Sequence, residues 1–221
     1  MRASARLALV AVAASLLAAT EVHAQVTAAT ANCVVFGKPK PTTTYVYRRS
    51  DSSGPVTQYS HRWTEFTAER ASVSVVRGKV NEVVANRHKI EDDVTMIAAI
   101  VSRSSSGASR TDFRPAMTGD PMFRACVGRS WNIKAVAATY TSGAQVSTAY
   151  TYAGTMRIVS PRETIQVPAG RFECVRYTRT LATPTGPSLD EYWKSVEHGV
   201  VVKQVSKVGG WTSTSELTAI K

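Results

Sequence analysis

The chain has 221 residues, and its 27 Lys and Arg against 16 Asp and Glu give a formal net charge of +11. Hydrophobic residues make up 43% of it, with aromatic and β-branched residues throughout, which excludes an intrinsically disordered protein. After the first 24 residues no apolar stretch is long enough to cross a bilayer as a helix, so we expect a protein that is not integral to the membrane.

Residues 1–24 have the order of a secretory signal peptide. Arg2 and Arg6 form a basic region, residues 7–19 are mostly apolar, and Val22-His23-Ala24 places small or apolar side chains before a cleavage site. The apolar stretch is too short to span a membrane. We therefore expect export, a periplasmic location, and a mature chain that begins at Gln25. Residues 25–221 are enough for a single β-rich domain with a buried core.

The composition after residue 24 favours strands. That part of the chain holds 25 Val and 24 Thr but only three Leu, and Val and Thr suit a pleated surface better than a helix. A period of two is clearest over residues 144–158. We predict a mainly β protein, an antiparallel meander forming a curved open sheet or half-barrel, with one or two short helices. In chain order, the expected strands are residues 43–48, 56–66, 71–77, 80–86, 131–141, 144–158, 162–167, 171–180, 191–194, 199–207 and 211–220.

Residues 91–101 are the exception to this pattern. Glu91-Asp92-Asp93 precedes apolar residues at positions 94, 97, 100 and 101, and acids in a first turn followed by that spacing favour an amphipathic helix. A buried strand over residues 94–101 is the alternative, because short apolar runs are ambiguous. Cation binding by the three acids is disfavoured, since their spacing does not match a calcium loop. Residues 102–121 are predicted to be mostly loop.

The three cysteines are Cys33, Cys126 and Cys174. An exported chain enters an oxidising compartment, so we expect one disulfide bond. Three pairings are possible, and we favour Cys126–Cys174 because both lie in the half with the clearer strand pattern. No pair of Cys or His has metal-ligand spacing, and the sequence contains no phosphate-binding loop and no nucleophile or zinc motif. We therefore expect no cofactor, no metal and no enzymatic activity.

The positive charge is spread evenly along the chain. A nucleic-acid-binding protein usually concentrates its charge in a tail, stripe or helix, so we expect no nucleic-acid partner. An excess of this kind fits attraction to an anionic envelope surface.

Three motifs occur in the second half of the chain: Cys126-Val127-Gly128-Arg129-Ser130-Trp131, then Glu163 to Phe172 around Val167-Pro168-Ala169-Gly170, then Tyr192-Trp193 followed by Gly199 to Lys203. Their order resembles a family of exported bacterial domains of unknown function, whose fold is likened to the lipoprotein-carrier (LolA/LolB-like) half-barrel, an open sheet around a helix. The match covers mainly residues 121–208. The resemblance implies no catalytic residue.

The residues of these motifs indicate a structural role. Pro168 presets φ and Gly170 can take a positive φ, so this segment predicts a tight turn that returns Phe172 to the sheet. The full set of structural motif residues is Gly128, Trp131, Pro168, Gly170, Phe172, Trp193 and Gly199.

The even-numbered face of residues 144–158 carries our candidate ligand-lining residues, Tyr150, Tyr152, Met156 and Ile158. Tyr and Met combine adaptable apolar surface with polar or polarizable atoms. We expect all four to be partly accessible and to line a concave sheet that binds a hydrophobic ligand or a lipidated partner without catalysis. The alternatives are an envelope structural or interaction module with a filled core, and an exported hydrolase.

Overall fold

The computed structural model describes residues 32–67, 70–77, 87–104, 107–141, 144–147, 149–183 and 186–221. The expected signal peptide and the expected strand over residues 80–86 lie outside these ranges. The chain divides into two units, Met1–Cys33 and Val34–Lys221, and the second unit holds nearly all of the described residues.

The described residues form fifteen strands and no helix. The strands are β1 (Cys33–Val35), β2 (Thr44–Asp51), β3 (Thr57–Phe66), β4 (Arg70–Arg77), β5 (Arg87–Glu91), β6 (Val94–Ser104), β7 (Gly107–Pro121), β8 (Arg124–Cys126), β9 (Ser130–Thr141), β10 (Ala144–Gln145), β11 (Tyr150–Val167), β12 (Gly170–Thr183), β13 (Gly186–Ser195), β14 (Val201–Val208) and β15 (Trp211–Ile220).

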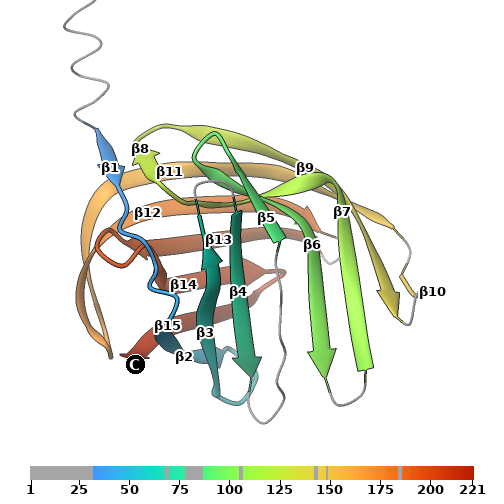
Figure 1. Ribbon diagram of the computed structural model, residues 1–221, viewed down its shortest axis with the longest axis horizontal. Coiled ribbons are helices and arrows are strands. Elements are labelled where there is room, and N and C mark those ends of the chain that lie inside the picture. The colour runs from blue at the N-terminus through green and yellow to red at the C-terminus, as the bar shows by residue number, and fades with distance from the viewer. Residues whose placement is uncertain are drawn as a thin grey trace, which may run out of the picture. The chain divides into compact units, whose positions relative to one another are not determined.

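Thirteen strands form one antiparallel sheet in the order β10-β9-β11-β12-β13-β14-β15-β2-β3-β4-β5-β6-β7 (Figure 1). From β11 to β15 each strand pairs with the next in sequence, and β15 then pairs with β2. β9 also pairs with β7, and within the described residues β4 and β5 pair at two positions, Arg70 with Lys89 and Ala71 with His88. The predicted antiparallel β architecture is therefore confirmed.

The predicted helix over residues 91–101 is wrong, and the alternative strand is correct. Asp92 and Asp93 form a two-residue turn between β5 and β6, with φ of +51° and +64°, values that Asp tolerates in hairpin turns. β6 pairs on one side with β5 and on the other with β7. Its β-branched residues suit that position, since they lose rotamer freedom in a helix. The long strand β7 replaces the loop predicted over residues 102–121.

Residues 144–158 and 162–167 are not two strands as predicted. Only Ala144 and Gln145 belong to β10, and β11 runs without a break from Tyr150 to Val167. The pairing of β11 with β12 shifts register between Ile158 and Glu163. Pro161 lies in this irregular part, which is where a sheet accommodates proline.

Among the described residues, two apolar clusters form the core. The larger joins β7, β9, β11, β12 and β13 and includes Phe113, Ile133, Met156, Ile158 and Tyr177. The smaller joins β2, β14 and β15 to the tip of the β11–β12 hairpin, and its members are Tyr45, Tyr47, Val167, Phe172, Cys174, Val200, Val202 and Leu217.

The tight turn predicted around Pro168 is confirmed. Val167 pairs with Gly170 across a two-residue turn, and the Ala169 amide donates a hydrogen bond to the Leu217 carbonyl at 3.1 Å. Phe172 returns to the sheet and packs in the smaller cluster with Leu217. The motif therefore fastens the hairpin tip to β15.

Gly199 occupies a position that no other residue fits. Its φ is +63°, and a Cβ built on it would lie 2.0 Å from the Gly37 carbonyl oxygen. The chain at this turn therefore needs both the backbone freedom and the small size of glycine.

The predicted Cys126–Cys174 disulfide is wrong. Cys33 and Cys126 form the bond, and Cys174 is a free, fully buried thiol. Cys126 ends β8, which pairs with the strand that starts at Cys33, while Cys174 lies within the smaller cluster. Burial raises the pKa of the Cys174 thiol to about 12.

The turn after Pro168 gives a stability test. Gly170 has a φ of +137° with no close neighbour for a Cβ, so Gly170→Ala should lower the free energy of unfolding by about 1–3 kcal/mol through backbone strain alone. Gly54→Ala is the matched control, because its φ is not in the strained range and its nearest contact is an ordinary 3.5 Å. Urea denaturation measures both, and equal stability of the two variants would contradict this role for Gly170.

Candidate functional site

The inner face of the sheet lines a cavity of about 1100 Å³. Strands β2, β3, β4, β11, β12, β13, β14 and β15 contribute its walls. Its lining side chains are Arg49, Asp51, Thr57, Gln58, Tyr59, His61, Arg77, Tyr150, Tyr152, Thr183, Ser188, Asp190, Gln204, Ser206, Val208, Trp211, Ser213 and Ser215.

A row of polar side chains crosses the cavity floor from strand to strand. Asp190 on β13 pairs with Ser206 on β14, Ser206 with Ser213 on β15, and Ser213 with Asp51 on β2. We call these four residues the polar row. Because directly paired residues point to the same side of a sheet, the row presents two hydroxyl groups between two carboxylates.

An arginine holds each carboxylate of the polar row. Arg179 donates from Nε and Nη2 to Asp190 Oδ2 at 3.2 and 3.0 Å, and Arg49 Nε donates to Asp51 Oδ1 at 2.8 Å. Charge-assisted hydrogen bonds of this kind fix the orientation of a carboxylate. The row is therefore an ordered array of donors and acceptors.

Aromatic rings flank the floor. The Arg49 guanidinium lies 5.2 Å from the ring centroid of Trp211, and Arg77 lies 5.9 Å from that of Tyr59. On the β11 side the rings of Tyr150 and Tyr152 are 4.7 Å apart, with their hydroxyl groups in contact. The cavity lining thus combines aromatic side chains with hydroxyl, amide and charged groups.

Only two of the four candidate ligand-lining residues reach this cavity. Tyr150 and Tyr152 line it, and burial, helped by the neighbouring Tyr150, raises the pKa of Tyr152. Met156 and Ile158 have no exposed surface and belong to the larger core cluster, so the expectation that they are partly accessible is wrong. β11 runs from the cavity, at Tyr150 and Tyr152, into the larger core cluster, at Met156 and Ile158.

A smaller compartment of about 120 Å³ adjoins the cavity and shares Tyr59, His61, Gln204 and Ser215 with it. Lys194 lies here, buried, and its Nζ donates to the Pro121 carbonyl at 2.6 Å. Asp120 accepts a hydrogen bond from the Tyr177 hydroxyl at 2.9 Å. Burial lowers the pKa of Lys194 to about 8, and the charge of Asp120 acts in the opposite direction.

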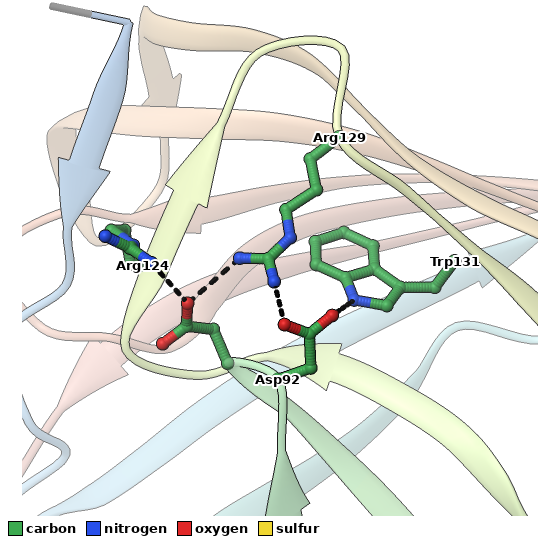
Figure 2. Close-up of polar contacts among 5 residues, drawn as sticks. Asp92, Arg124, Arg129 and Trp131 are labelled. Carbon is green, nitrogen blue, oxygen red and sulfur yellow. Dashed lines mark hydrogen bonds and ion pairs between the residues drawn. The ribbon is translucent and has the colours of Figure 1, made fainter. Parts of the chain in front are cut away.

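The carboxylates of the Asp92–Asp93 turn accept hydrogen bonds from arginine and tryptophan side chains (Figure 2). Asp93 Oδ2 accepts hydrogen bonds from Arg124 at 3.2 Å and Arg129 at 2.9 Å. Asp92 accepts one from Arg129 and another from Trp131 Nε1, the latter at 3.1 Å. This cluster fastens the β5–β6 turn to β8 through Arg124, to the following loop through Arg129 and to β9 through Trp131.

The motif residues outside the cavity are structural. Gly128 lies in the turn before β9 with a φ of +80°, and Trp131 belongs to the cluster just described. Trp193 donates from Nε1 to Glu163 at 3.0 Å and lies 5.9 Å from Lys203 Nζ. Neither tryptophan lines the cavity, whereas Trp211 does.

Sequence reasoning missed the polar row and Arg49. The available signal was a period of two, which puts the cavity-lining residues of each strand on one face. These residues are Gln204, Ser206 and Val208 on β14, and Trp211, Ser213 and Ser215 on β15. An alternating polar set ordinarily marks the solvent face of a strand, so the pattern alone assigns these residues to the outside.

The described residues contain neither a grouped set of metal ligands nor a membrane-spanning helix. Among the residues that the structure describes, no three His, Cys, Asp or Glu side chains are grouped as a metal site would require. Within the same residues, no helix has the length and apolar character needed to cross a membrane.

No protein-family model matches the chain, and no curated protein matches it. Among solved structures, it is similar to a Bacteroides fragilis protein described as exported and of YmcC-like fold, at 16% identity over 86% of this chain and 100% of that one, with a TM-score of 0.48. It is also similar to the hypothetical lipoprotein YmcC from Escherichia coli, at 12% identity over 80% and 86% of the two chains, with a TM-score of 0.39.

A third similar structure is a β-barrel-like protein of a domain of unknown function from Brucella abortus, at 8% identity over 85% of this chain and 98% of that one, with a TM-score of 0.45. All three TM-scores are below 0.5, so these likenesses carry no argument about the site. The resemblance to the lipoprotein-carrier half-barrel is not shown, and the described residues contain no helix for a sheet to surround.

His61 connects the two compartments and gives a pH test. Burial, together with the charge of Arg77, lowers the pKa of His61 from 6.5 to about 4, while Asp120 acts to raise it. The unfolded chain therefore binds the proton first, so stability should fall as the pH drops from 6.5 to 4, by up to about 3 kcal/mol.

Urea denaturation at pH 7 and pH 4 measures this loss in the wild type and in His61→Gln, which has no titrating group at this position. The difference in stability loss between the two proteins is the contribution of His61, because the carboxylates titrate in both. An identical pH dependence in both would show that His61 is solvated rather than buried.

Proposed function

We propose that this chain is an exported periplasmic domain that binds a small ligand in the cavity of its curved sheet and does not catalyse a reaction. The signal-peptide pattern of residues 1–24 supports export. The Cys33–Cys126 disulfide supports an oxidising compartment. The basic excess of the sequence fits a location beside an anionic envelope surface, which we include in the proposal.

The observation that carries the proposal is the cavity itself. Its volume of about 1100 Å³ is slightly above the range of about 300–1,000 Å³ that is usual for small-molecule sites. Polar groups and aromatic faces converge in it, and the arginine–carboxylate pairs hold some of those groups in fixed positions. A packed structural module needs no such space.

The chemistry of the lining changes the hypothesis of a hydrophobic ligand. Val208 is the one aliphatic side chain among the described residues that line the cavity. An acyl chain would leave many of the polar groups there without hydrogen-bond partners, and burying unpaired polar groups is costly. A polar ligand with some apolar surface fits this lining better than a lipid tail.

The states of Cys174 and Lys194 support binding over covalent hydrolysis by either of these two groups. The Cys174 thiol is buried and its raised pKa makes it a poor nucleophile. The Lys194 amine is hydrogen-bonded to the Pro121 carbonyl. Neither group is placed to attack a molecule in the larger cavity.

Native mass spectrometry of the protein purified from its own envelope, without detergent, tests the proposal. The wild type should carry a bound small molecule, and Ser206→Trp should lose it because the new ring fills the cavity. Lys207→Trp is the matched control, since Lys207 is the exposed neighbour on β14. Circular dichroism checks that both variants fold, and a wild type without any bound ligand would contradict the proposal in favour of a packed module.

A further inference from the structure

The polar row has a regular spacing. Neighbouring strands in a sheet lie about 4.7–4.9 Å apart, so the four residues on β13, β14, β15 and β2 extend over roughly 14 Å. Along that line the side chains are a carboxylate, two hydroxyls and a carboxylate. A ligand that matches the whole row must repeat polar groups at short intervals along its length.

The hydrogen-bonding capacity of the row is well defined. A serine hydroxyl both donates and accepts, and a carboxylate only accepts. Arg179 uses only Oδ2 of Asp190, and Arg49 uses only Oδ1 of Asp51. Because every carboxylate oxygen has more than one acceptor position, Asp51 can still accept hydrogen bonds from ligand hydroxyl groups, and Asp190, which also interacts with the Tyr192 hydroxyl, keeps part of this capacity.

The aromatic side chains add the second requirement. Trp211 lies two residues before Ser213 on β15 and lines the cavity, whereas the Tyr59 ring is already stacked on Tyr47, with the two ring centroids 5.1 Å apart. The face of an aromatic ring carries partial negative charge and attracts the weakly positive C–H groups of a saturated ring. A ligand that uses both features therefore has ring faces of C–H groups and edges of hydroxyl groups.

Two other ligand classes fit less well. An anionic ligand would gain no net attraction from the polar row, because an arginine is already paired with each of its carboxylates. An acyl chain would find one aliphatic side chain among the described lining residues. The pairing of each row carboxylate with an arginine favours an uncharged partner, because the charges already balance one another.

We infer that the ligand of this cavity is a short neutral saccharide, whose hydroxyl groups bind the polar row while one of its ring faces stacks on Trp211. This inference rests on the proposed function and names the chemical class of the ligand. It assigns Asp51, Ser206, Ser213 and Asp190 as hydrogen-bonding residues and Trp211 as the main stacking residue.

An array of neutral and acidic oligosaccharides, followed by isothermal titration of the strongest neutral binder, tests the inference on the mature protein. The fluorescent fatty acid cis-parinaric acid serves as the acyl probe. We expect binding of a neutral saccharide and none of the acyl probe. Trp211→Leu and the double variant Ser206→Ala/Ser213→Ala should each weaken saccharide binding at least tenfold.

Trp193→Leu is the matched control, because Trp193 contacts Glu163 and Lys203 rather than the cavity, and it should bind as the wild type does. Thermal denaturation identifies any variant that fails to fold, and the serine variants remove only one oxygen each. Binding of the acyl probe or of acidic saccharides in preference to neutral ones would overturn the inference and leave the proposed function standing. If no probe binds and no ligand accompanies the protein from its envelope, both are overturned.

Discussion

The cavity depends on the pairing of β15 with β2. This pairing joins the last strand to the first strand of the large sheet and runs from Ile220 opposite Tyr45 to Ser213 opposite Asp51. It completes the smaller core cluster by bringing Leu217 to Tyr45 and Tyr47. It also places Asp51 and Arg49 beside the serines of β15, so the same long-range contact builds a core at one end of these strands and the polar row at the other. The turn at Pro168 and Ala169 reinforces it through the hydrogen bond to Leu217.

One face of the sheet thus has two roles along its length. Where strands β7, β9 and β11 pack with β12, inward side chains such as Met156 and Ile158 are fully buried. Toward Trp211 and Tyr150 the same face becomes polar and aromatic and surrounds the cavity. The compartment with Asp120 and Lys194 adjoins the cavity, and the hydrogen bond from Lys194 to the Pro121 carbonyl fastens β13 to the end of β7. A buried charge with such a partner is expensive to leave unpaired, which makes this link specific.

Much of the second half of the fold could be predicted, because period-two alternation and turn residues act locally. The turn at Pro168 and the strands from β12 to β15 are examples. The first half of the fold is harder to predict. The acids at positions 91–93 match the pattern of a helix start. The Ser, Thr and Arg residues of β7 favour a loop, and only its pairing with β6 and β9 shows that it is a strand. The disulfide and the polar row could not be predicted for a related reason. Which cysteines meet, and which face of a strand points inward, are decided by contacts between distant segments.

If the cavity is open to molecules from solution, a thiol introduced by Ser206→Cys will be accessible, and thiol labelling of this variant measures that access. The native free thiol of Cys174 is the internal control, because it is fully buried in the smaller core cluster. With iodoacetamide under native conditions at pH 8, we expect the cysteine at position 206 to react at close to the rate of an exposed thiol, while Cys174 reacts only after unfolding. A cysteine at position 206 that is as unreactive as Cys174 in the folded protein would contradict an open cavity.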